Sequence, residues 1–224
     1  MARTDTTAAR ARPAIVALAP IALLIGFVAH PFIGMGFPSD EAVGAAAAAE
    51  PTRWGVAHLM VGVASGLLIL AFLAVRSYVR EAGEERSTAR AIPWIVVGST
   101  LYTLLPGMEM AQTAIASTGG DPRALEEGLT PWFVPTLFAS ALIFAVGVIA
   151  FARGLASSGV FGRGVTRFVN SGLVVMALSR LVPLAAVGFY VQSAAALVAL
   201  LPAAYVMWAQ PESRAARQSR PVAA

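Results

Sequence analysis

Long apolar stretches separated by short polar segments make up most of this chain. A helix needs about 20 apolar residues to cross the hydrocarbon layer of a bilayer. Six stretches reach or approach that length, and the last is the shortest. They predict membrane spans at about 13–36, 54–75, 91–117, 131–152, 168–189 and 191–209.

These spans predict an all-α fold, a polytopic membrane protein built as one six-transmembrane-helix bundle over residues 13–209. A short segment, 1–12, precedes the bundle, and a polar tail, 210–224, follows it. The alanine run 45–49, between the first two spans, is compatible with a short helix lying on the outer face. Nothing in the pattern indicates a second domain.

The composition supports a membrane protein. The 224 residues are 58% hydrophobic and 12% charged, with a mean hydropathy of +0.73, whereas about a quarter of the residues are charged in a soluble domain. The absence of cysteine excludes disulfides, thiolate metal sites and cysteine nucleophiles. The pI of about 10.3 would suggest a nucleic-acid partner for a soluble protein. Here the arginines lie beside the spans, so we expect contact with anionic lipid headgroups and no nucleic acid.

The arginines also predict the orientation. Cytoplasmic loops of membrane proteins carry an excess of basic residues. With the N-terminus inside, the outer segments hold only Arg53 and Arg123. The inner segments hold Arg3, Arg10, Arg12, Arg76, Arg80, Arg86, Arg90, Arg153, Arg163, Arg167, Arg214, Arg217 and Arg220. We therefore expect both termini to be cytoplasmic. All 16 basic residues are arginine and alanine is abundant, which suggests a GC-rich genome and hence the inner membrane of a bacterium.

Four ionisable residues fall inside the outer halves of different predicted spans. They are His30, His58, Glu109 and Arg180. At 1.5 Å per residue, they lie roughly 6 to 14 Å below the outer ends of their spans. Ionisable groups at membrane depth are costly and seldom face lipid, so they mark a functional site.

The spacing of polar residues predicts which helix faces turn inward. Tyr102, Glu109, Gln112 and Thr113 form a polar stripe along the third span. His58 shares a face with the pair Gly62–Gly66, whose GxxxG spacing permits close helix contact.

A small-residue face on the fourth span carries Thr136. The prolines of the spans are expected to kink or break the helices near the polar layer and so to make room for a cavity. They are Pro20, Pro31, Pro106, Pro135, Pro183 and Pro202.

A metal or a haem is one interpretation of this polar centre. Two neutral imidazoles and a carboxylate suit zinc or non-haem iron, so His30, His58 and Glu109 are candidate ligands of a divalent metal. The two histidines alone are candidate axial ligands of a b-type haem. The structural alternative is that both histidines cap helix ends near the headgroups and bind no cofactor.

Acid–base chemistry is a second interpretation. A carboxyl group among apolar side chains is favoured in its protonated form, so Glu109 is a candidate acid for a lipophilic substrate. Tyr102 and a histidine would relay the proton, and Arg180, Gln112 and Thr136 would line the substrate site. Small membrane enzymes that cyclise or isomerise isoprenoids use a buried acid of this kind, which is an analogy of chemistry without a shared motif. The structural alternative is an ion pair between Glu109 and Arg180.

Transport is a third interpretation, because intramembrane charge and kinked helices occur in transporters. At 224 residues such a protein would require a homo-oligomer. The leading hypothesis is a small membrane enzyme that acts on a lipid- or isoprenoid-like molecule by metal-assisted or acid–base chemistry. Its catalytic residues would be Glu109, His58, His30 and Tyr102, and its partners membrane lipids and the lipophilic substrate.

Overall fold

The computed structural model describes residues 6–81, 83 and 86–210, and these residues form helices and loops without a strand. The predicted residues 1–5 of the N-terminal segment and 211–224 of the tail lie outside the described residues. In chain order the elements are α1 (Thr6–Ala29), α2 (Asp40–Ala49), α3 (Pro51–Arg80), α4 (Ser87–Ser117), α5 (Pro122–Ser158), α6 (Arg163–Ser179), the π-helix η1 (Val187–Val191) and α7 (Gln192–Ala209).

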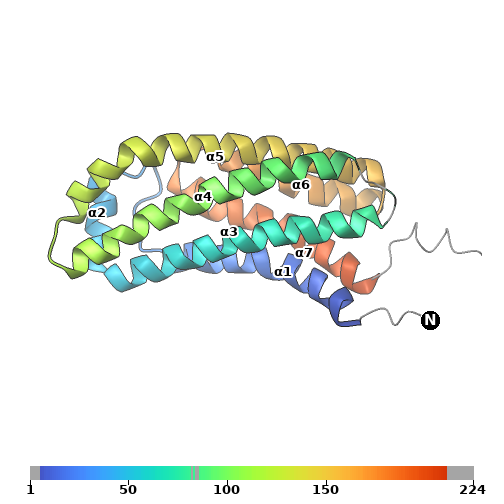
Figure 1. Cartoon of the computed structure of the whole chain (residues 1–224), viewed down its shortest axis with the longest axis horizontal. Helices are drawn as coiled ribbons and strands as arrows, with labels where there is room; N and C mark the ends of the chain where they lie inside the picture. The colour runs from blue at the N-terminus through green and yellow to red at the C-terminus, as the bar shows by residue number, and fades with distance from the viewer. Residues whose placement is uncertain (1–5, 82, 84–85, 211–224) are drawn as a thin grey trace, which may run out of the picture.

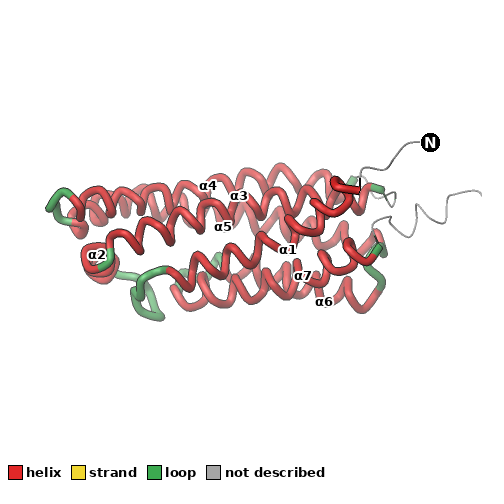
Figure 2. Tube along the Cα trace, turned by 90° about the horizontal axis from the view of Figure 1, so that it is seen from below, coloured by secondary structure: helices red, strands yellow, loops and turns green. Residues whose placement is uncertain are grey.

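The long helices run side by side as an elongated bundle (Figure 1). The short helix α2 and the connection between α4 and α5 lie at one end, which we call the α2 end. The start of α1 and the end of α7 lie at the opposite end. Seen from below, short loops join most of the helices, and a longer loop runs between α1 and α2 (Figure 2).

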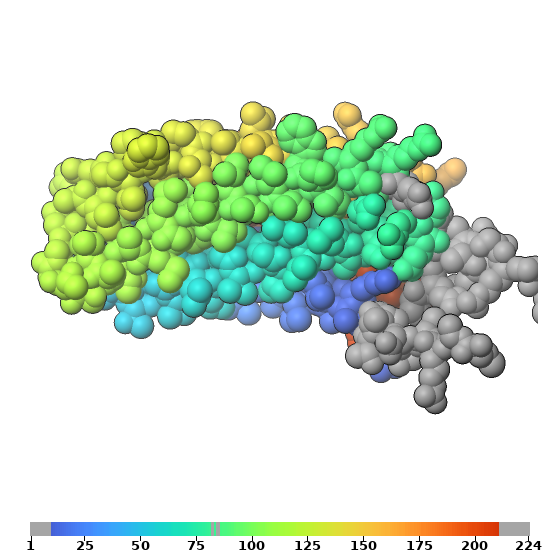
Figure 3. Space-filling view, viewed as in Figure 1, coloured from blue at the N-terminus to red at the C-terminus, as the bar shows by residue number. Residues whose placement is uncertain are grey.

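Five helical segments are long and apolar enough to cross a membrane: Arg10–Ala29, Pro51–Arg80, Ser87–Ser117, Pro122–Ser158 and Val187–Ala209. Large apolar side chains are exposed along their outer surfaces, including Leu59, Leu104 and Leu142. Figure 3 shows the face of the bundle on which α3, α4 and α5 lie. A soluble protein rarely exposes apolar surface on this scale, so the chain has the character of a multi-pass membrane protein.

The prediction of six continuous spans is wrong at the fifth. The predicted span 168–189 ends early, because α6 stops at Ser179 and an irregular segment, 180–186, follows it, of which only the last two residues are helical. Helical structure resumes at Ala185, passes through the π-helix η1 and continues into α7, across the predicted boundary at 189–191. The predicted first span also ends early, at Ala29 instead of residue 36.

These two interruptions support each other. The backbone N–H groups of Ala185 and Ala186 donate to the carbonyls of Gly36 and Met35, at 3.0 and 3.3 Å. Backbone groups inside a membrane must find partners in the protein. The loop after α1 therefore satisfies part of the irregular segment before α7.

Most of the prolines do not break their helices. α4 continues through Pro106, α5 through Pro135 and α7 through Pro202. Only Pro31 and Pro183 of the prolines in the predicted polar layer lie outside a helix. The expected breaks are therefore limited to the α1–α2 loop and the segment 180–186.

Close helix contact occurs at other glycines than the predicted pair. A Cβ added at Gly98 of α4 would meet Phe144 N of α5 at 2.6 Å, and one added at Gly147 of α5 would meet Ile95 N of α4 at 2.8 Å. By contrast, a Cβ added at Gly66 would meet nothing within 4 Å. Small residues thus bring α4 and α5 together, and the pair Gly62–Gly66 does not form the close contact.

The alanine run lies in the predicted short helix. Ser39 caps α2 by accepting a hydrogen bond from Ala42 N at 3.2 Å. α2 buries Val43 and Ala47, which cluster with Trp54. Gly44 lies against the backbone of Arg123, so α2 packs on the start of α5 and covers this end of the bundle.

Candidate functional site

A cavity of about 330 Å³ lies between the helices toward the α2 end. Its wall is mainly aliphatic and aromatic, from α1, α3, α4, α5 and the irregular segment before α7. The four ionisable residues singled out in the sequence, His30, His58, Glu109 and Arg180, all line this one cavity. Its volume and apolar wall are typical of a small-molecule site.

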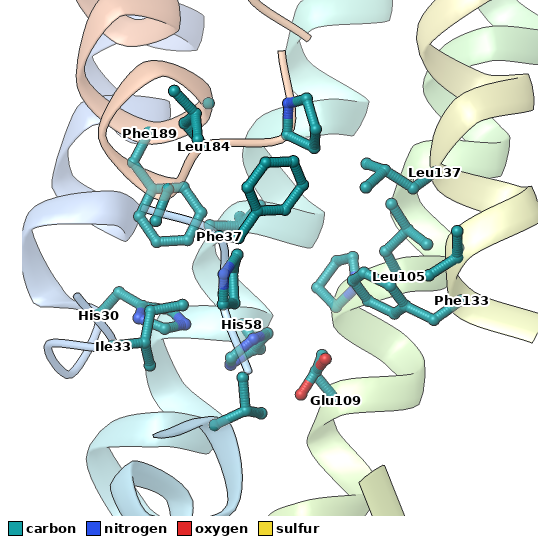
Figure 4. A pocket seen from close by; sticks show the side chains of 18 of the residues that line it. His30, Ile33, Phe37, His58, Leu105, Glu109, Phe133, Leu137, Leu184 and Phe189 are labelled. Carbon is teal, nitrogen blue, oxygen red and sulfur yellow. The ribbon is translucent and has the colours of Figure 1, made fainter. Parts of the chain in front are cut away.

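Glu109 projects from α4 into the cavity, toward His58 (Figure 4). The residue is only 6% exposed, and its Oε2 atom has no hydrogen-bond partner among the described residues. Leu105, one turn earlier on α4, and Leu137 of α5 form an apolar wall on the same side of the cavity. A buried carboxyl oxygen without a partner is costly, and a polar ligand group would satisfy it.

The two histidines face the cavity with their rings in contact. Their ring centroids are 4.8 Å apart at an interplanar angle of 62°. His30 Nδ1 lies 2.6 Å from the carbonyl oxygen of Pro31, and His58 Nδ1 lies 2.8 Å from that of Trp54. A carbonyl oxygen only accepts, so both rings carry a proton on Nδ1. In the neutral ring this leaves Nε2 as a proton acceptor.

His30 lies in the loop just after α1. Burial lowers the pKa of this imidazole, the hydrogen bond to Pro31 opposes that shift, and the positive charge of Arg53 lowers the pKa further. The neutral ring is therefore favoured. Trp54 packs against both rings, with centroids 4.8 Å from His30 and 4.6 Å from His58.

Trp54 connects the histidines to the acid. Its Nε1 donates to the backbone carbonyl of Glu109 at 2.9 Å, and its own carbonyl accepts from His58. This fully buried side chain joins α3 to α4 at the site. This role was not evident from the sequence, because the spacing of residues within α3 does not show which group on another helix Trp54 contacts.

The side chains do not fit the metal or haem sites that the sequence suggested. Among the described residues, no three histidine or carboxylate side chains are grouped so as to hold one metal ion. Axial ligands of a haem lie on opposite faces of the porphyrin, whereas the rings of His30 and His58 touch and leave no layer for it.

Glu109 and Arg180 do not form the ion pair that the sequence allowed. The Arg180 guanidinium lies over the rings of Tyr102 and Phe144, with Cζ 4.2 and 3.7 Å from their centroids. The ion pairs found in the described part of the chain join other residues, Arg12–Glu81, Arg53–Glu50 and Arg123–Glu127. Cation–π contacts take the place of a carboxylate partner, and Tyr102 lies beside Arg180 and not beside Glu109.

Gln112 and Thr136 do not line the cavity. Gln112 is buried behind it and donates through Nε2 to Glu126 Oε2 at 2.7 Å, whereas Thr136 is half-buried on α5. Glu126 does line the cavity, as does Asp40 of α2, which accepts from Thr130 at 3.2 Å. Both carboxylates lie between the predicted spans, so the sequence did not indicate them as site residues. The structure brings them to the cavity because Asp40 begins α2 and because α5 starts at Pro122, before Glu126.

The segment around η1 supplies the remaining wall. Arg180, Leu184, Phe189 and Gln192 all line the cavity. Phe189 stacks on Phe27 of α1 with centroids 4.6 Å apart. Single π-helical turns are frequent at functional sites, and here one contributes to the wall of the cavity between α6 and α7.

Comparisons with known proteins add no identity to this geometry. The chain matches no protein-family model, and no curated protein or solved structure is significantly similar to it. Its function therefore has to be inferred from the side chains of the cavity.

Proposed function

We propose that this protein is a membrane-embedded enzyme that binds a lipophilic molecule in the cavity and relocates a proton on it. The observation that carries the proposal is the buried carboxyl of Glu109, which has an unpartnered oxygen and faces His58 across the same cavity. An acid and a base at one apolar site are what proton transfer to and from a carbon skeleton requires.

The reaction that needs nothing further is a double-bond isomerisation. The protonated Glu109 carboxyl donates its proton to one alkene carbon of the substrate. His58 Nε2 then accepts a proton from the carbon next to the resulting cation, and the double bond re-forms one position along. The proton returns from the imidazolium to the Glu109 carboxylate. Atoms and charges balance without a co-reactant, and the His58–Trp54 hydrogen bond keeps Nε2 as the accepting atom.

The apolar wall suits this chemistry. Burying an unpaired charge is costly, so the Glu109 carboxyl is favoured as a neutral acid until a substrate arrives. Leu105, Phe133 and Leu137 keep water from the carbon that is protonated. Excluding water prevents hydration of a cationic intermediate.

We further propose that the α2 end faces outward from a bacterial cytoplasmic membrane. In the described residues Arg53 and Arg123 lie at the α2 end, and the helix ends at the opposite end carry nine arginines. These nine are Arg10, Arg12, Arg76, Arg80, Arg86, Arg90, Arg153, Arg163 and Arg167. The positive-inside rule makes that end cytoplasmic.

Deuterium exchange tests the enzyme even while the identity of its substrate is open. The purified protein, in liposomes made with a total bacterial lipid extract, is incubated in D₂O, and all lipids are then analysed by mass spectrometry. We expect one lipid class to gain deuterium at carbon in a protein-dependent way. Glu109→Gln should slow this gain by about 10²–10⁴-fold, the usual contribution of a general acid.

Two controls decide the outcome. Glu127→Gln alters an exposed carboxylate paired with Arg123 and should leave the exchange unchanged. Circular dichroism checks that Glu109→Gln is folded. Deuterium gain that persists in a folded Glu109→Gln protein, or no protein-dependent gain in any lipid, would reject the enzyme.

Transport of a small molecule is the second candidate function. It is favoured by the segment 180–186, which separates α6 from η1 and α7 at the wall of the cavity, since transporters often have non-helical backbone at their substrate sites. It predicts substrate flux into liposomes without chemical change. Loss of that flux in Arg180→Gln, with no deuterium exchange, would favour the transporter.

A further inference from the structure

We infer that the ligand of the cavity carries an acidic head group, a carboxylate, and that Arg180 binds it. This inference rests on the proposed function in one respect, namely that the cavity takes a lipophilic ligand. It adds the chemical class of that ligand and the end of the cavity at which its charge lies.

The charge of Arg180 lacks an anionic partner in the described structure. The residue is 4% exposed and lines the cavity, and its Nη1 atom makes no hydrogen bond to any described residue. A buried cation is strongly destabilising unless it is paired and hydrogen-bonded. Stacking on two aromatic rings offsets part of that cost but leaves the N–H groups of Nη1 without an acceptor.

The surrounding side chains hold the guanidinium in place. Its faces lie against Tyr102 and Phe144. The amide of Gln192 satisfies its neighbours when its oxygen faces Arg180; that oxygen then accepts from Nε at 3.0 Å and from Nη2 at 3.3 Å, while the amide nitrogen donates to Gly188 O at 3.0 Å. The edge that bears Nη1 is what remains for a ligand, and an arginine edge suits a planar carboxylate.

The distribution of charge places the acid at this end of the cavity. Tyr102, which lies under Arg180, is seven residues before Glu109 on the same helix, so the two levels differ by about 10 Å along α4. The other level also carries Glu126 and Asp40. A ligand anion is repelled by those carboxylates and attracted by Arg180. The lipophilic part of the ligand then extends toward Glu109 and His58.

A set of 12-carbon probes tests the charge directly. Laurate, dodecanol and dodecylamine have the same chain and differ in the head group. Each competes with radiolabelled laurate for the protein in nanodiscs of neutral phosphatidylcholine, with empty nanodiscs subtracted. We expect laurate to bind at least about tenfold more tightly than dodecanol, because a hydrogen bond to a charged group contributes that much. Dodecylamine should not compete.

Two kinds of variant locate the site. Arg180→Gln should abolish the preference for laurate over dodecanol, and Arg180→Lys should retain part of it. Arg123→Gln is the matched control, because that side chain is 57% exposed and paired with Glu127. Leu137→Trp leaves Arg180 intact and fills the cavity, so it should block laurate even if Arg180→Gln does not fold.

Equal binding of laurate and dodecanol by the wild-type protein would overturn the inference, as would an undiminished laurate preference in folded Arg180→Gln. The test is independent of the proposed chemistry. Glu109→Gln should keep laurate binding and lose deuterium exchange. A preference for laurate without any deuterium exchange would reject the enzyme and support the carboxylate site at Arg180. Deuterium exchange without a preference for laurate would support the enzyme and reject the carboxylate site.

Discussion

Trp54 is the side chain on which the arrangement of the polar centre depends. Its indole Nε1 donates to the Glu109 carbonyl, and the backbone carbonyl of Trp54 accepts from His58 Nδ1. Its ring fills the space between α3 and α4 and is fully buried. The indole N–H thus reaches the backbone carbonyl of Glu109 on α4. Pro106 lies about one turn earlier on the same helix. The orientation of Glu109 therefore depends on a residue of another helix.

Replacing Trp54 by Phe should destabilise the protein. A smaller aromatic ring remains, and the buried carbonyl of Glu109 loses its indole donor; together these losses should cost about 1–3 kcal/mol. The free energy of unfolding in mixed micelles measures this loss. Trp132→Phe is the control, because Trp132 is 71% exposed and its replacement should cost little. Equal losses for the two variants would contradict the role assigned to Trp54.

Glu109 and Arg180 should behave as independent residues. Arg180 contacts Tyr102 and Phe144 and forms no ion pair with Glu109 within the described structure. The stability changes of Glu109→Gln and Arg180→Met should then add to within about 0.5 kcal/mol in the double variant. A double-mutant cycle of unfolding free energies measures the coupling. Coupling well above that value would show that the two charges contact each other in the folded protein.

The contact between α4 and α5 depends on glycines whose neighbours are backbone atoms. Gly98 lies against Phe144 N, and Gly147 lies against Ile95 N. Such close approach strengthens dispersion contacts between helices in a membrane, where the hydrophobic effect contributes little. The rings that flank Arg180 come from these same two helices, so the seam also positions the cation.

A methyl group at this seam should separate the helices. Gly98→Ala brings a Cβ to 2.6 Å from Phe144 N, so backbone must move, and we expect a loss of about 1–3 kcal/mol of stability. Gly66→Ala is the matched control on α3, because its Cβ would meet nothing within 4 Å. Unfolding in mixed micelles compares the two. If the Gly98→Ala protein were as stable as the Gly66→Ala protein, α4 and α5 would not be in close backbone contact at Gly98.

The bundle as a unit combines an apolar exterior with charges gathered at its two ends. Leu104 and Leu142 are exposed along its length, whereas Arg53 and Arg123 lie at the α2 end and most other described arginines lie at the opposite end. An apolar belt between two charged ends suits insertion across a bilayer.

Single cysteines should report the orientation, because the chain contains no cysteine of its own. Thr118→Cys lies at the α2 end and Ser157→Cys at the opposite end, both at exposed positions. A membrane-impermeant maleimide applied to intact bacterial cells should label Thr118→Cys at once and Ser157→Cys only after the membrane is permeabilised. The reverse pattern would place the α2 end in the cytoplasm.

Several features could be predicted from the sequence because they depend on local composition. Apolar runs predicted the helices that became α3, α4, α5 and α7, since hydropathy over about 20 residues is sufficient to recognise a span. The same averaging failed at residues 168–189. The mean hydropathy of a sequence window does not show that the N–H groups of Ala185 and Ala186 have their acceptors in the loop after α1. Pro106 was expected to kink or break its helix, but α4 continues through it to Ser117.

The polar side chains at membrane depth were likewise conspicuous in the sequence, because an ionisable residue in an apolar run is unusual wherever it points. Which of them touch could be decided only by how the helices are rotated and staggered against one another. That packing gives Trp54 to Glu109, two aromatic rings to Arg180 and a place in the cavity to Glu126. Each of these pairings joins residues far apart in the chain, and spacing within one helix carries no information about its neighbour.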